Sequence, residues 1–268
     1  MFNINTRSIT GDGGLPIFLA VPENLPGPVP AIVLMHERYG FVQHTQELAE
    51  RIAGDGFVCM APDFFFKHPD QEALHAGDAR YDMNDDEAAE LLDTAVDHLE
   101  QMDDVADGCI AIMGVCQTGR HPLILAGRRH IGAALVWVGA AQDREWEVNE
   151  VYPEPLEDVI SRIECPVLGI FGETDHMISL DHVRRFRDCF ERHRKSYSIH
   201  IYQDAPHGWL NDTMPGRYRR AQAEAGLALQ YQFLQEIFSP AYDLGSVHWR
   251  FECHSSHDYD FTKNVRLE

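Results

Sequence analysis

The chain lacks the long apolar runs and the cysteine pairs that mark several classes of protein. No stretch of about 18 or more apolar residues occurs, and no basic segment followed by an apolar run stands at its start, which argues against a transmembrane helix and a secretory signal peptide. The six cysteines are widely spaced and form no C-x-x-C pair, which argues against a zinc ribbon or a small disulfide framework. We therefore expect a soluble protein of the reducing cytoplasm.

Basic residues are scarce relative to acidic ones. The chain has 22 Lys and Arg against 43 Asp and Glu, a formal net charge of −21 with neutral histidines. A field of that sign repels phosphate backbones and anionic lipid head groups. We therefore expect neither nucleic acid nor a membrane as a partner, and an anionic substrate would need arginines placed close to its site.

No internal repeat and no low-complexity linker interrupts the chain before about residue 239. Its 268 residues, with 44% hydrophobic and 24% charged residues, have the composition of an ordinary globular enzyme or binding domain. We predict one domain over residues 1–238, followed by an extension over residues 239–268.

Short apolar runs alternate with amphipathic helical patterns along the predicted domain. Predicted strands cover residues 15–21, 31–35, 57–61, 109–115, 133–138, 167–171 and 198–202. Predicted helices cover residues 45–53, 86–102, 181–190 and 219–238, with Asp181 as the cap of the third. This alternation predicts an α/β fold with a largely parallel, doubly wound sheet, which binds ligands at the carboxyl ends of its strands.

A candidate nucleophile follows the strand at residues 109–115. The turn from Gly114 to Gly119 joins this strand to a predicted helix, which is the setting of a nucleophile elbow, and Cys116 would be the raised side chain. The helix N-terminus favours a thiolate there, and the N–H of Gln117 would point at an oxyanion. Alone, Cys116 could equally be a buried small hydrophobic residue.

A candidate acid and base follow later strands in the chain order of an α/β-hydrolase triad. Asp175 ends the strand at residues 167–171, and His207 follows the strand at residues 198–202. Taken singly, Asp175 could be a turn residue and His207 a loop histidine. With Cys116, their order predicts a nucleophile, an acid and a base.

The chain resembles the dienelactone hydrolases, the cysteine-dependent branch of the α/β-hydrolases, over residues 1–238. The motifs are Gly114-Val115-Cys116-Gln117-Thr118-Gly119, His36-Glu37-Arg38-Tyr39-Gly40, Ala61-Pro62-Asp63, Asp175 and His207-Gly208. The resemblance implies Cys116 as nucleophile, His207 as base, Asp175 as the group that orients it, and Glu37 as a carboxylate that engages the resting thiol. Glu37 paired with Arg38 on the surface is the alternative. The amide of Glu37 or Arg38 would donate the second oxyanion hydrogen bond.

Two positions depart from the family pattern. Thr118 stands where the family usually has a glycine, and Asn211 stands where it places an arginine that holds the substrate carboxylate. Remaining candidates for anion binding are Arg80, Arg217, Arg38 and Arg120, of which Arg80 is preferred because the family carries another such arginine in that segment. Each could instead be a solvated surface residue. Tyr39, Trp209 and Phe64 are candidate pocket walls or core residues.

The extension carries a strand-like alternation at Val247, Trp249, Phe251 and Cys253, and Tyr259, Phe261 and Val265 could form a return strand. A hairpin alone is marginal, so we expect this arm to pack on the domain or to form a homo-oligomer with a neighbouring subunit. His248, Cys253, His254 and His257 lack a metal-binding spacing, so no metal is expected.

The sequence thus predicts a hydrolase that opens a small activated lactone or ester through a thioester acyl-enzyme, without a cofactor. The resemblance implies a carboxylate on that substrate and a place in aromatic degradation. Two alternatives remain: an esterase or acyl transferase acting on neutral substrates, and a non-catalytic small-molecule-binding protein on the same fold.

Overall fold

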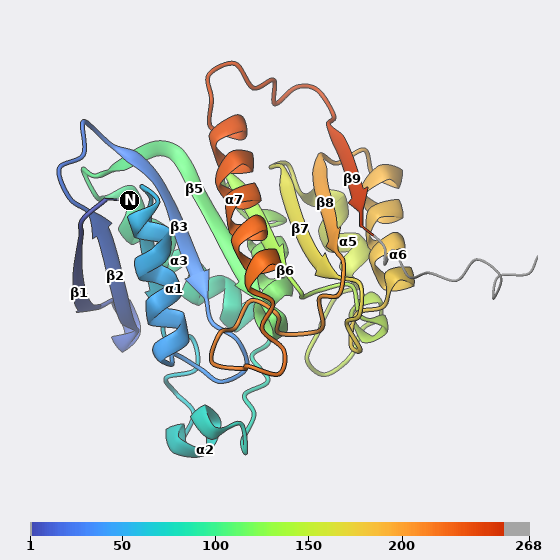
Figure 1. Cartoon of the computed structure of the whole chain (residues 1–268), viewed down its shortest axis with the longest axis horizontal. Helices are drawn as coiled ribbons and strands as arrows, with labels where there is room; N and C mark the ends of the chain where they lie inside the picture. Colours follow the sequence, from blue (N-terminus) through green and yellow to red (C-terminus); the bar gives the residue numbers. More distant parts are fainter. Residues whose placement is uncertain (1, 255–268) are drawn as a thin grey trace, which may run out of the picture.

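One nine-stranded sheet organises the protein, and the computed structural model describes residues 2–254 (Figure 1). Its strand order is β1-β2-β4-β3-β5-β6-β7-β8-β9. β2 is antiparallel to both of its neighbours, β1 and β4, and all other neighbouring strands are parallel. The strands are β1 (Ile4–Thr10), β2 (Pro16–Pro22), β3 (Val29–Met35), β4 (Val58–Pro62), β5 (Val105–Val115), β6 (Ala133–Trp137), β7 (Val167–Gly172), β8 (Tyr197–Tyr202) and β9 (Trp249–Cys253). The predicted α/β architecture with a mostly parallel sheet is confirmed.

Helices cover both faces of the sheet. The front face in Figure 1 carries α1 (Gln43–Gly54) and α7 (Arg220–Ile237), and the opposite face carries α3 (Asp85–Glu100), α4 (His121–Ala126), α5 (Leu156–Arg162) and α6 (Leu180–Arg192). The helix α2 (Gln71–Ala76) lies beyond the carboxyl ends of the central strands. Short 3₁₀ turns form η1 (Asp12–Gly14), η2 (Cys116–Arg120) and η3 (Asp143–Trp146). The apolar faces of the strands and helices bury two clusters, one on each side of the sheet.

Three differences between the predicted and the observed elements have local causes. The unpredicted strand β1 has the polar sequence INTRSIT and lies at the sheet edge, so it shows little apolar alternation. The helix α4 is buried all round and has no amphipathic pattern. The predicted cap Asp181 lies inside the first turn of α6, because the Ser179 hydroxyl accepts the N–H of His182 at 3.2 Å and is the cap instead.

The extension adds β9 to the sheet beside β8, with Tyr197 paired to Trp249 and Ile201 to Cys253. The described part of the arm therefore packs on its own domain. The predicted return strand at Tyr259, Phe261 and Val265 lies outside the described residues, as does His257. Among residues 2–254, no helix has both the length and the apolar character needed to cross a bilayer.

Candidate active site

Cys116 lies at a sharp bend between β5 and η2. Its φ is +57°, the left-handed region that a nucleophile elbow requires of a non-glycine residue. Two close backbone approaches fix the bend: a Cβ on Gly114 would lie 2.4 Å from the carbonyl oxygen of Thr118, and one on Gly119 would lie 2.5 Å from the Cα of Gly139. The elbow therefore depends on glycine at both positions.

Thr118, the first departure from the family pattern, is built into this elbow. Its side chain is fully buried, its hydroxyl donates to the carbonyl of His36 at 3.0 Å, and it accepts the N–H of Val115 at 3.1 Å. The ring of His36 in turn accepts the N–H of Phe64 at 3.0 Å. Thr118 thereby ties the elbow to the β3 loop that carries Glu37.

The structure brings the three predicted triad residues into contact. The Sγ of Cys116 lies 3.0 Å from the Nε2 of His207, and the Nδ1 of His207 lies 2.8 Å from the Oδ2 of Asp175. The other carboxylate oxygen of Asp175 accepts the N–H groups of Met177 at 2.7 Å and Ile178 at 3.0 Å. A nucleophile, a base and an orienting carboxylate thus lie in one hydrogen-bonded line.

Gly172 allows the acid and base loops to approach each other. A Cβ on Gly172, the last residue of β7, would lie 2.0 Å from the carbonyl oxygen of Ala205, two residues before His207. Only hydrogen fits there, so the loops that carry Asp175 and His207 can pack directly together.

Electrostatics favour the protonated form of His207. Burial alone would lower its pKa, but the hydrogen bonds to Asp175 and Cys116 and their negative charge raise the pKa of His207 to about 10. At neutral pH this raised pKa favours the imidazolium form of His207.

Glu37 is buried near the triad but is held by another residue. The side-chain amide of Asn211 donates to the Oε2 of Glu37, and the Oδ1 of Asn211 accepts the N–H and the hydroxyl of Thr213. The resemblance predicts that Glu37 engages the resting thiol. In the structure the thiol instead contacts His207, and Glu37 is bonded to Asn211. Asn211 occupies the place of the family's arginine and holds Glu37 through a neutral amide.

A pocket of about 190 Å³ opens above Cys116, and we call it the Cys116 pocket. Its lining contains Cys116 and His207 together with the predicted residues Glu37, Arg38, Tyr39, Arg80, Gln117 and Arg217. It also contains Gly208 of the His207-Gly208 motif, and five residues that the sequence did not indicate, Gln142, Arg144, His176, Met177 and Met214. Arg144 carries no motif, but its place after the carboxyl end of β6 could have indicated it.

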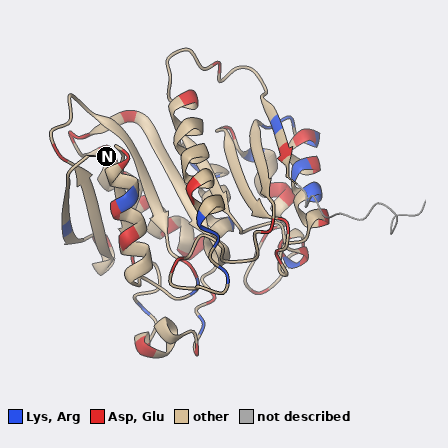
Figure 2. Ribbon diagram, viewed as in Figure 1, with Lys and Arg blue, Asp and Glu red and all other residues tan. Residues whose placement is uncertain are grey.

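The arginines of this pocket are short of carboxylate partners. Within residues 2–254, no Asp or Glu oxygen lies within 4 Å of the guanidinium groups of Arg38, Arg144 or Arg217, and only Arg80 pairs, with Asp82 at 2.8 Å. The chain has almost twice as many acidic as basic residues. Along α6, for example, the arginines lie among acidic residues (Figure 2). The pocket therefore gathers four arginines in an acidic protein, three of them without an ion pair to a carboxylate within the described residues.

Three predicted pocket candidates lie elsewhere. Trp209 is fully buried in the core, with its ring 5.5 Å from that of Trp137, and the prediction that it lines the pocket is wrong. Phe64 is 1% exposed and belongs to the core on the opposite face. Arg120 is 1% exposed and forms a buried ion pair with Asp85, so it is not available to a substrate.

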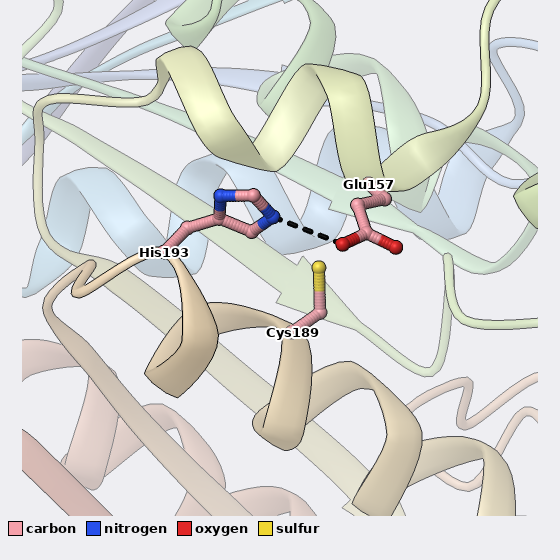
Figure 3. Close-up of side chains that lie close together, drawn as sticks. All are labelled: Glu157, Cys189 and His193. Atoms are coloured by element: carbon pink, nitrogen blue, oxygen red, sulfur yellow. Dashed lines mark hydrogen bonds and ion pairs between the residues drawn. The ribbon is translucent and has the colours of Figure 1, made fainter.

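Glu157, Cys189 and His193 form a second polar cluster, between α5 and α6 (Figure 3). Their ligand atoms lie within 4.8 Å of one another, the only such group that the described chain contains. However, the Oε1 of Glu157 already accepts from Arg192 at 2.6 Å and lies 3.0 Å from the Nε2 of His193. These partners lower the pKa of Glu157, as expected of a surface ion-pair network, and none of the three residues lines the Cys116 pocket.

Comparison with known proteins gives relatives over most of the chain. The sequence model of the family described as "Dienelactone hydrolase family" matches residues 15–238. Curated relatives named "Putative carboxymethylenebutenolidase" are 27% identical over 225 residues in Yersinia pestis, covering 79% of this chain and 80% of the relative, and 26% identical over 236 residues in Escherichia coli K12, covering 82% of each.

Solved structures agree on the fold. The crystal structure of a dienelactone hydrolase-like promiscuous phosphotriesterase from metagenomic libraries superposes with a TM-score of 0.71 at 20% identity. The match covers 88% of this chain and 99% of that one. At this level of identity the likeness shows the α/β-hydrolase fold alone.

Proposed function

Because the chain belongs to the dienelactone hydrolase family of ester-bond hydrolases, we propose that it hydrolyses a small activated lactone or ester with Cys116 as the nucleophile. The observation that carries the proposal is the contact of Cys116 with His207 at 3.0 Å, at the floor of a solvent-accessible pocket. The bond from His207 to Asp175 supplies the orientation that a general base needs.

The reaction proceeds in two halves. The Cys116 thiolate attacks the carbonyl carbon, a C–S bond forms, and the carbonyl oxygen becomes an oxyanion. The C–O bond to the leaving group then breaks, and the imidazolium of His207 gives its proton to the departing oxygen, leaving a thioester. Neutral His207 next takes a proton from water, the resulting hydroxide attacks the thioester, and breakage of the C–S bond releases the acid and restores the thiolate–imidazolium pair.

Backbone amides at the two loop ends beside the thiol hold the oxyanion in this mechanism. One is the N–H of Gln117, in the first turn of η2, where helix amides have no intrahelical partner. The second is the N–H of Glu37 or Arg38 at the end of β3. Hydrogen bonds from Asn211 and the anchoring of His36 by Thr118 and Phe64 hold this second loop.

An enol ester or lactone suits this site better than an amide. A thiolate is a good leaving group, so a tetrahedral intermediate with a poor amine leaving group returns to reactants. A carboxylate on the substrate fits the guanidinium groups of Arg144 and Arg217, which lack a carboxylate partner in the described structure. The buried Nε of Arg38 also has no hydrogen-bond partner among the described residues.

Replacing Cys116 with alanine tests the proposal. We expect Cys116→Ala to lose hydrolysis of a panel of lactones and aryl esters while its melting temperature stays close to that of the parent protein. The matched control Cys253→Ala removes an exposed thiol on β9 and should retain full activity. Retained activity in Cys116→Ala would reject the nucleophile, and absence of hydrolysis by the parent protein would favour a binding protein.

A panel that pairs each carboxylate-bearing ester with a neutral analogue tests the substrate class. We expect a higher kcat/KM for the carboxylate-bearing member of each pair. Preference for the neutral member would instead support a general esterase, the alternative that Asn211 leaves open.

A further inference from the structure

Arg120 connects the elbow to a loop of the Cys116 pocket without entering the pocket. It lies four residues after Cys116 at the end of η2, and its side chain is 1% exposed. Its Nε and Nη2 donate to the carboxylate of Asp85 at 3.0 and 2.9 Å. Asp85 begins α3 and directly follows the segment that carries Arg80, so this paired contact fixes where that segment ends.

The same segment has a further contact with the elbow. The side-chain amide of Gln117 donates to the carbonyl of Tyr81. Two side chains of η2 therefore bond to the residues that lead into α3, Gln117 at Tyr81 and Arg120 at Asp85. Of these two contacts, only that of Arg120 is an ion pair.

The other side of the Arg120 guanidinium holds the loop between β6 and α5. Its Nη1 donates to the carbonyl of Glu145 at 3.2 Å, and its Nη2 donates to the carbonyl of Glu154 at 2.7 Å. The ring of Tyr152 lies under the guanidinium, 4.5 Å from its central carbon. This loop carries Arg144, the pocket arginine immediately before Glu145.

The backbone of this second loop is strained where it leaves β6. Val138, Ala140 and Ala141 all have positive φ, at 43°, 54° and 70°, a region that side chains with a Cβ rarely adopt. Residues in this region persist only when their surroundings hold them. Arg120 holds this loop at two later points, at Glu145 within η3 and at Glu154 just before α5.

We propose that Arg120 is a positioning residue for substrate specificity, which holds the loops of Arg80 and Arg144 at the distance that an anionic substrate requires. It acts through these two arginines and contacts neither the thiol nor the substrate. The proposal rests on the anionic substrate class proposed above. The planar guanidinium of Arg120 has five donors, so one group can bond to the carboxylate of Asp85 and to two carbonyl oxygens of the loop between β6 and α5.

Two variants of Arg120 separate this role from a merely structural one. Arg120→Met removes all of the contacts, and Arg120→Lys keeps the buried charge beside Asp85 but loses the fork. The matched control is Arg129→Met, which removes an arginine that pairs with Asp93, Asp97 and Glu100 and does not line the pocket. Thermal melting and circular dichroism establish that each variant is folded.

The readout is the split between KM and kcat on two matched esters, mono(para-nitrophenyl) adipate and para-nitrophenyl hexanoate, which differ by one carboxylate. We expect Arg120→Lys and Arg120→Met to raise KM for the adipate ester by about tenfold, the effect of misplacing one charge-assisted hydrogen bond. Both constants for the hexanoate ester should stay within about twofold of the parent values, and Arg129→Met should change neither ester.

The remaining outcomes overturn the proposal in distinguishable ways. An equal loss on both esters in the folded Arg120→Lys variant would show a general structural role. An unchanged KM for the adipate ester in Arg120→Lys, with a raised KM in Arg144→Gln, would overturn the positioning role of Arg120. The proposed function would still stand. If the parent protein showed no preference for the adipate ester, both the anionic substrate class and the positioning role of Arg120 would be overturned. The Cys116→Ala variant would still test the nucleophile independently.

Discussion

Replacing Asp175 with asparagine should lower the alkaline limit of activity by roughly two pH units. Asp175 bonds His207 at 2.8 Å, and the ring is 4% exposed, so the carboxylate charge acts on it with little solvent screening. Asparagine has nearly the same shape but no charge. The variant therefore removes the first of the contacts that raise the pKa of His207 while the burial that lowers this pKa remains.

The size of the effect follows from the pKa of His207 itself. A rise from 6.5 to about 10 corresponds to roughly 5 kcal/mol in favour of the imidazolium, at 1.36 kcal/mol per unit. Because the pKa is raised, the ring keeps its proton until the pH passes about 10, and activity that needs the imidazolium falls only above that value. In Asp175→Asn we expect this limb to shift down by roughly two units, because the contacts with Cys116 that also raise the pKa remain.

The assay is the pH dependence of kcat/KM, which reports ionisations of the free enzyme. Asp212→Asn is the matched control, because Asp212 pairs with His44 at 3.0 Å outside the Cys116 pocket, and its alkaline limb should match that of the parent protein. An unmoved limb in a folded, active Asp175→Asn variant would refute the reasoning that Asp175 sets the protonation state of His207.

Two further substitutions test the packing of the site. Gly172→Ala places a Cβ 2.0 Å from the carbonyl oxygen of Ala205, so we expect the free energy of unfolding to fall by about 1–3 kcal/mol in urea denaturation; an unchanged midpoint and slope would contradict the close approach. Asn211→Ala leaves the buried Glu37 without its amide donor, so we expect kcat/KM to fall about tenfold in steady-state assays; parent-like kinetics would show that Asn211 does not position Glu37.

Most strands of the sheet and the positions of the three triad candidates could be predicted because both follow from local signals; β1, with its polar sequence, could not. Each predicted strand is a short apolar run, and the structure places a strand at every one of them. Cys116, Asp175 and His207 each follow such a strand, and the carboxyl ends of neighbouring parallel strands meet at one edge of a sheet.

The features of the site that the sequence did not predict depend on contacts between segments that are distant along the chain. Trp209 directly follows Gly208 beside the base, but its ring turns into the core against Trp137, a direction that no local pattern encodes. The approach of Gly119 to Gly139 joins residues from different loops. Arg144 has no motif and becomes a pocket residue only because its loop folds over the elbow.

The most direct measurement is the mass of the acyl adduct during turnover. The parent protein is mixed with a para-nitrophenyl ester, quenched in acid within the first turnover, digested and mapped by mass spectrometry. The account predicts one acyl group as a thioester on the peptide that contains Cys116, formed at the rate of nitrophenolate release and lost at the rate of turnover. Turnover with no adduct at any time, or with the acyl group on another residue, would contradict it.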